Sequence, residues 1–117
     1  MARREDLLLF ISHGASLSEG RWIPAADVYR TPDGWMIKVE LAGTRPSDIE
    51  LCLEGSHLHV RGVRRDTENI GECYQMEIVY GPFERVITLP FEVRPRVVET
   101  EYINGLLIIR LLCDEGD

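Results

Sequence analysis

Large apolar residues recur at every second position through much of the chain. The alternation is clearest in residues 35–41, 49–53 and 57–61, where most of the intervening positions are polar or charged. A period of two is typical of a β-strand with one buried face, because successive side chains of a strand point to opposite sides. Residues 26–30 are a further short candidate, closed by the turn-forming sequence Thr-Pro-Asp-Gly at residues 31–34.

The strongest single element is a hairpin in residues 97–111. Asn104-Gly105 separates two runs of strand-forming residues, and these residue types reach the positive φ of a type I′ turn at the least steric cost. After the turn, the odd-numbered residues 107–111 form one apolar face, and Leu106 and Ile108 make the opposite face apolar too. We expect the N-terminal arm or a neighbouring chain to cover that second face; binding of clients or a second subunit is the alternative.

Two stretches have a less regular pattern. Residues 63–75 are polar and could hold one short strand around residues 70–74. Residues 76–89 predict a long strand interrupted at Gly81-Pro82, because proline lacks the N–H group that a central strand needs and is confined to edges and bulges. A connector, residues 90–95, then leads to the hairpin.

These strands together predict an all-β protein. Seven to nine short strands, with turns every eight to twelve residues and no long helical pattern, are typical of a β-sandwich. The apolar face of each strand must be buried against a second sheet, and that burial is the main source of stability. We expect the sandwich to span residues 22–112, with a short flexible arm in residues 1–21 and a short stub in residues 113–117.

Composition and charge limit the function. A chain of 117 residues fits one domain with an ordinary core. Its net charge of −7 and pI near 4.9 argue against binding to nucleic acid or to an anionic membrane. We expect a cytoplasmic protein, because the three cysteines lack the spacing of a disulfide framework and the sequence shows neither a secretory leader nor an apolar run of transmembrane length.

Candidate chemistry is sparse. One side of a predicted hairpin carries residue types that bind zinc or copper, namely Cys52, His57 and His59. Three candidates without a fourth ligand are a weak signal. We therefore prefer the interpretation that this face of the sheet is solvated. Cys73 lies in the polar stretch, where an inert thiol is favoured over an intersubunit disulfide. The chain has no G-x-S-x-G elbow, P-loop or G-x-G-x-x-G fingerprint. We therefore predict no active site and no cofactor.

The N-terminal arm contains an uninterrupted apolar run that needs cover from a partner or from the domain itself. Its members are Leu7, Leu8, Leu9, Phe10 and Ile11.

Several motifs resemble the α-crystallin domain of small heat-shock proteins. Residues 22–29 resemble its opening x-P-x-x-D-v-y, and residues 39–43 resemble v-e-L-P-G with alanine for proline. Residues 48–62 are similar to d-I-x-v followed by L-x-I-x-G. Residues 80–90 resemble Y-G-x-F-x-R-x-f-x-L-P, and residues 100–107 resemble A-x-y-x-N-G-v-L with threonine for alanine. The motifs follow one another in the family's order.

The resemblance implies an immunoglobulin-like sandwich of antiparallel strands and an ATP-independent holdase that binds partly unfolded proteins. It also implies a homodimer made by strand exchange, in which a strand from residues 63–75 pairs with the partner's first strand near residues 26–30. Arg85 stands at the family's arginine position and is expected to pair with an acid within or across the dimer. The implied dimer residues are Ala26, Asp27, Val28, Tyr29, Ile70, Cys73, Tyr74 and Arg85.

The family also has a groove that accepts an Ile-x-Ile/Val tail from another subunit. The residues that would line it here, for tails or clients, are Ile49, Leu51, Leu53, Val98 and Thr100. The sequence departs from the family pattern in two ways: no Ile-x-Ile follows Leu112, and the arm is short. Because both features serve to build large assemblies in the family, we expect a dimer or small oligomer. The leading alternative is a co-chaperone-like adaptor that docks on a folded partner. A third hypothesis is a metal or redox enzyme that uses Cys52, His57 and His59.

Overall fold

The computed structural model describes the backbone of residues 8–10 and the full residues 21–67 and 71–114. These residues form eight strands and one 3₁₀ turn, η2 (Pro46–Asp48). The strands are β1 (Leu8–Phe10), β2 (Ala26–Thr31), β3 (Gly34–Glu40), β4 (Ile49–Glu54), β5 (His57–Arg64), β6 (Gly81–Thr88), β7 (Val97–Ile103) and β8 (Leu106–Leu112).

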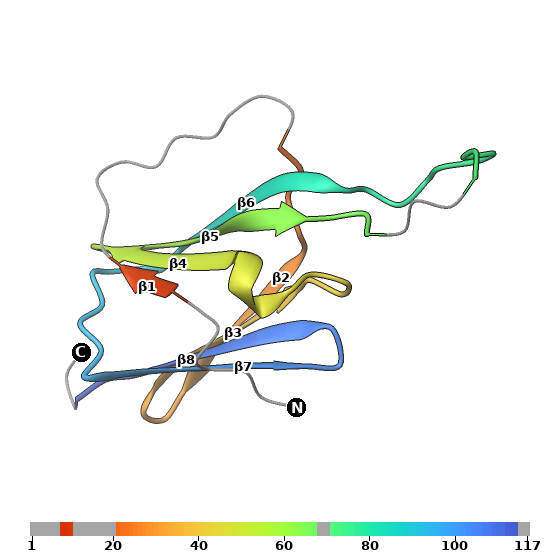
Figure 1. Ribbon diagram of the computed structural model, residues 1–117. Helices are drawn as coiled ribbons and strands as arrows, with labels where there is room; N and C mark the ends of the chain where they lie inside the picture. The colour runs from red at the N-terminus through yellow and green to blue at the C-terminus, as the bar shows by residue number, and fades with distance from the viewer. Residues whose placement is uncertain (1–7, 11–20, 68–70, 115–117) are drawn as a thin grey trace.

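The strands make two four-stranded sheets that lie face to face (Figure 1). One sheet has the order β1-β4-β5-β6 and the other has the order β2-β3-β8-β7. Each pairing is antiparallel except that between β1 and β4, which is parallel. The predicted all-β sandwich is therefore confirmed, while β1 is a strand that the sequence pattern did not indicate.

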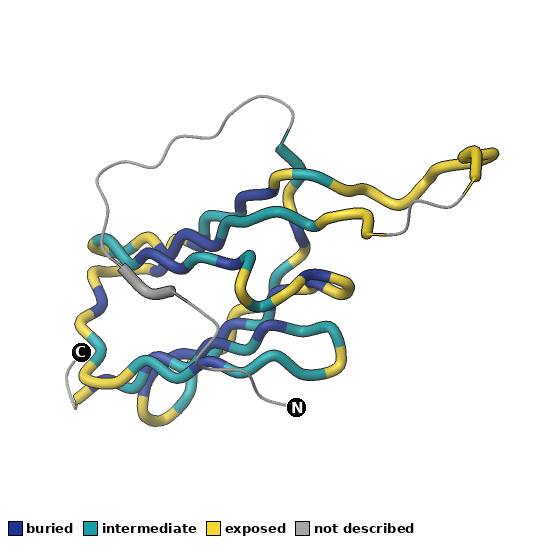
Figure 2. The backbone as a smooth tube through the Cα atoms, viewed as in Figure 1, coloured by how far each residue is buried: buried dark blue, intermediate teal, exposed yellow. Residues whose placement is uncertain are grey.

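The core lies between the sheets, where the alternating residues of both inner faces meet (Figure 2). Burial of such side chains contributes roughly 25 cal/mol per Å² of apolar surface, so this layer dominates the stability of the fold. Its fully buried side chains include Ile37, Val39, Leu41, Ile49, Leu51, Leu58, Val60, Phe83, Leu107, Ile109 and Leu111.

The predicted hairpin is present as β7 and β8, with Asn104 at φ 53° and Gly105 at φ 77°. Both values are positive, as a type I′ turn requires. The inner residues of β8 are buried and the outer residues Leu106 and Ile108 are half-buried. In the sheet, Ile108 lies between Lys38 of β3 and a glutamate of β7, so charged neighbours flank the apolar outer positions.

The strand predicted for residues 76–89 is wrong in its first part. β6 begins at Gly81, and residues 71–80 contain no strand and project away from the sandwich (Figure 1). Gly81 has φ 106°, so the chain changes direction there instead of continuing the strand. β6 is an edge strand, which is where the proline at residue 82 was expected. The short strand expected around residues 70–74 is absent from its described part, 71–74.

Candidate interaction surfaces

Strand β2 presents a free edge. It is the first strand of its sheet and, within the described chain, pairs with β3 alone. Val28 and Tyr29 expose about two fifths of their surface, at 42% and 41%, Asp27 is exposed, and Ala26 packs against the core. The unpaired N–H and C=O groups of an edge strand are a template for another strand. These four residues therefore lie where the sequence placed half of the dimer interface.

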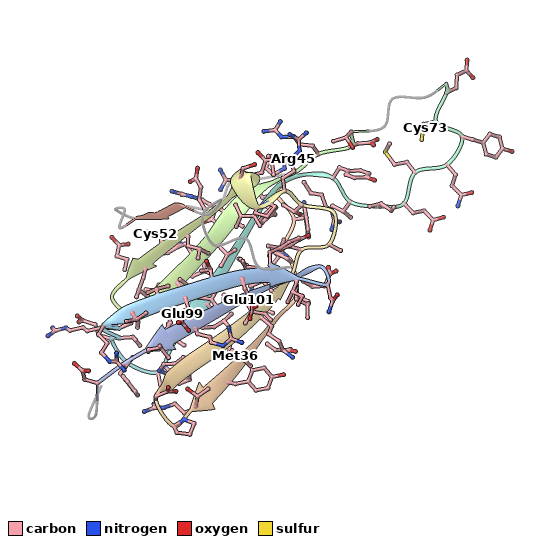
Figure 3. All side chains as sticks on the ribbon, turned by 60° about the horizontal axis from the view of Figure 1, so that its bottom comes forward. Met36, Arg45, Cys52, Cys73, Glu99 and Glu101 are labelled. Carbon is pink, nitrogen blue, oxygen red and sulfur yellow. The ribbon has the colours of Figure 1, made fainter. Side chains whose placement is uncertain are left out.

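The segment of residues 71–80, called here the projecting segment, is exposed at every position (Figure 2). Cys73 has a free thiol and lies at the outer end of this segment, far from the two sheets (Figure 3). Tyr74 is fully exposed, whereas Ile70 lies outside the described residues. The large apolar side chains exposed on the segment are Tyr74, Met76, Ile78, Val79 and Tyr80.

The sequence pattern did not predict the exposure of most of that apolar set, because it placed residues 76–80 in one long strand with residues 83–89. A signal was nevertheless present. Tyr74, Met76, Ile78 and Tyr80 alternate with other residues directly before Gly81-Pro82, so the pattern indicated strand-forming residues that a chain break separates from the sandwich.

Arg85 of β6 lies near the segment that leads into β2 and has an unsatisfied buried donor. Its Nη1 atom donates a long hydrogen bond, 3.5 Å, to the carbonyl oxygen of Pro24. Its Nε atom is buried and has no hydrogen-bond partner. Among the described residues no acid forms an ion pair with Arg85, so the expected pairing within one chain is not found there. An unsatisfied buried donor of this kind is costly unless another group reaches it.

The residues predicted to line a groove occupy β4 and β7. Ile49 and Leu51 are fully buried in the core and Thr100 is nearly so, while Leu53 and Val98 are half-buried. These side chains are therefore not freely accessible along their length.

The outer edge of β4 is already paired. The parallel strand β1 aligns Leu8 with Glu50, Leu9 with Leu51 and Phe10 with Cys52. Three residues of the arm that was predicted to be flexible are thus strand, and they lie along the edge where a foreign strand would add. The predicted arm residues Leu7 and Ile11 lie outside the described part.

The proposed ligand types on the hairpin of β4 and β5 are not on a solvated face, contrary to the sequence expectation. Cys52 and His59 are 1% and 7% exposed, and only His57 is open to solvent. The Nδ1 atom of His59 lies 3.5 Å from Oε2 of the fully buried Glu84, whose Oε1 accepts a 2.7 Å hydrogen bond from Arg21. The described residues contain no group of three or more His, Cys, Asp or Glu side chains that could hold a metal ion.

Two shallow hollows mark the surface. One, of about 230 Å³, lies between Arg21, Glu50 and Arg61; the other, of about 240 Å³, lies between Asp27 and Lys38 beside β2. Their described linings combine charged residues with small and large apolar ones, among them Phe83 and Leu106, and contain no Ser, Cys or His nucleophile. Within the described part of the chain, no helix has the length and hydrophobicity to cross a membrane.

The described residues thus form an immunoglobulin-like β-sandwich with an exposed apolar segment that projects from it. Residues 27–116 match the model of the Hsp20/alpha crystallin family, so the chain belongs to that family. This membership confirms the resemblance drawn from the sequence motifs.

Known proteins of the same kind are similar over most of the chain. Small heat shock protein C2 of Rickettsia felis is 30% identical over 99 residues, covering 83% of this chain and 64% of that protein. Spore protein SP21 of Stigmatella aurantiaca is 33% identical over 92 residues, covering 77% and 54%. The chain thus spans less than two thirds of the length of these two relatives. The solved heat shock protein 16.0 of Schizosaccharomyces pombe has a TM-score of 0.73 and 26% identity, covering 83% of this chain and 92% of that one.

Proposed function

We propose that the protein is an ATP-independent holdase that binds partly unfolded client proteins and suppresses their aggregation, acting as a homodimer or small oligomer in the cytoplasm. The observation that carries this proposal is the apolar run Leu7 to Ile11, part of which lies as β1 along the edge of β4, in a chain of the Hsp20/alpha crystallin family. A large apolar surface on a soluble domain is typical of a site for another protein. The function needs no cofactor and no catalytic group, and the net charge of −7 does not favour nucleic acid or membranes as partners.

The proposed dimer forms by reciprocal strand exchange. The projecting segment of each copy adds to the free edge of β2 in the other, so that main-chain hydrogen bonds satisfy both and Val28 and Tyr29 become covered. The exchange accounts for the exposed state of Met76 and Ile78 in a single chain. It also removes an edge that would otherwise template aggregation.

Arg85 supports the same arrangement. Its buried Nε atom has no partner in the single chain, and a carboxylate from the second copy would satisfy it with a charge-assisted hydrogen bond. We propose that Arg85 makes the ion pair across the dimer.

Clients are proposed to bind at the N-terminal arm, through Leu7 to Ile11, and along the β4–β7 side of the sandwich. Since β1 occupies the β4 edge, access to that edge requires β1 to leave. The same apolar strand would then be free to contact clients, so one displacement opens both surfaces.

The test is suppression of thermal aggregation. An equimolar amount of the protein, added without nucleotide to a heat-labile enzyme, is expected to reduce the turbidity that develops on heating. A variant with Leu7 to Ile11 all replaced by serine is expected to protect less, because it lacks the apolar arm, while retaining the sandwich core. Turbidity equal to that of the enzyme alone would contradict the holdase function and favour the adaptor that docks on a folded partner.

A further inference from the structure

Arg64, the last residue of β5, joins the projecting segment to the sandwich. Its Nε and Nη2 atoms both donate to the carbonyl oxygen of Val79, at 2.9 Å and 2.6 Å. Its Nη1 atom donates to the carbonyl oxygen of Ala42, at 3.1 Å. A single guanidinium therefore ties the base of the segment to the loop that follows β3.

The same guanidinium is stacked on aromatic rings. Its Cζ atom lies 4.3 Å from the centroid of the Trp22 ring and 6.0 Å from that of Tyr80. Stacking of an arginine plane on an aromatic face is favourable and fixes the orientation of both groups. Arg64 is thus held on one side by Trp22 while it binds the segment on the other.

Trp22 is itself rigidly placed against β6. Its Nε1 atom donates to the carbonyl oxygen of Gly81 at 3.1 Å, and its main-chain N–H donates to the carbonyl oxygen of Pro82 at 3.2 Å. Its ring lies 5.3 Å from the ring of the buried Phe83. The support for Arg64 therefore extends into the core.

We propose that Arg64 is a positioning residue for strand exchange, which sets the direction in which Met76 and Ile78 leave the sandwich. The inference rests on the proposed dimer. A segment fixed at its base loses less conformational entropy when it pairs with a second copy, so the dimer is more stable than one formed by a freely jointed loop. Lysine cannot replace this function fully, since one ammonium lacks the planar fork that reaches two carbonyl groups and stacks on a ring.

The test measures the dissociation constant of the dimer by sedimentation equilibrium for Arg64→Ala and Arg64→Lys. Arg65→Ala is the matched control, because Arg65 is the next residue and makes a two-bond contact with Asp48 on the exposed surface. We expect Arg64→Ala to raise the dissociation constant about tenfold or more, Arg64→Lys to raise it less, and Arg65→Ala to leave it unchanged.

Urea unfolding of the dissociated chains separates positioning from folding. The proposal expects Arg64→Lys to unfold at the same urea concentration as the wild type while its dimer is weaker. Dissociation constants for both Arg64 variants equal to that of the wild type would overturn the inference while leaving the proposed dimer in place. A wild-type chain that stays monomeric at all concentrations would overturn the dimer and the inference with it.

Discussion

Tyr102 links the edge strand β7 to the neighbouring loop by a single hydroxyl group. Its Oη atom donates a 2.8 Å hydrogen bond to the carbonyl oxygen of Leu41. Burial raises the pKa of the Tyr102 hydroxyl above its usual value near 10, and the charge of Glu40 adds to this effect. The fold therefore favours the neutral, hydrogen-bonding form of this side chain.

This shift predicts a loss of stability at alkaline pH. Because the pKa is higher in the folded state than in the unfolded chain, the contribution of Tyr102 is complete below about pH 10 and is lost as the pH rises through the folded-state pKa. Tyr102→Phe should cost about 1 kcal/mol at neutral pH through the lost hydrogen bond and should flatten the alkaline decline. Urea unfolding between neutral and alkaline pH measures both effects. An unchanged alkaline decline in the variant, with Tyr74→Phe as the exposed control, would contradict this role.

At the scale of elements, the hairpin of β7 and β8 shows how much local chemistry the sequence reveals. Asn104-Gly105 and the flanking alternation predicted the turn type and the buried face correctly, because both depend on residues adjacent in the chain. The same holds for β2 to β5, whose bounds the apolar pattern nearly reproduces.

The errors arose where the outcome depends on distant parts of the chain. Residues 76–80 have a strand pattern, but they pair with no strand of the described residues, and Gly81 redirects them. The burial of Cys52 and His59 also could not be predicted from the residues next to them in the sequence. His59 lies against Glu84, and Glu84 binds Arg21, so these contacts join distant parts of the chain. Alternation identifies a strand and its faces, but it does not identify the neighbour of a strand.

Two hairpin turns provide a matched pair of glycines, Gly105 between β7 and β8 and Gly55 between β4 and β5. A Cβ atom on Gly105 would lie 2.9 Å from Cβ of Ala42, whereas one on Gly55 would have no atom within 4 Å; both residues have positive φ. Gly55→Ala should therefore cost only the backbone strain, about 1–2 kcal/mol, and Gly105→Ala should cost more because the loop after β3 must move. Urea unfolding of the two variants tests this. Equal losses would show that the contact with Ala42 does not constrain the hairpin.

At the scale of the whole molecule, the sandwich carries surfaces that the proposed dimer would complete. Within the described chain, the β2 edge and the projecting segment each lack a strand partner, and the buried Nε of Arg85 lacks a hydrogen-bond acceptor. The β4 edge differs, because β1 already fills it. We infer that self-association uses the β2 edge, the projecting segment and Arg85, and that clients compete with β1 for the β4 edge.

Amide hydrogen exchange of β2 and of residues 74–80, measured on the wild type at high and at low protein concentration, tests this account most directly. Strand exchange predicts slow exchange at high concentration in residues 74–80 and at the β2 amides that do not bond to β3, and fast exchange of both sets after dilution, because each set supplies the other's hydrogen bonds. The β2 amides that bond to β3 stay protected at both concentrations. Ile78→Asp should show the fast pattern at both concentrations, while Val97→Asp, which changes an exposed apolar residue of β7, should behave as the wild type. Fast exchange of residues 74–80 in a sample whose mass is that of a dimer would contradict the account.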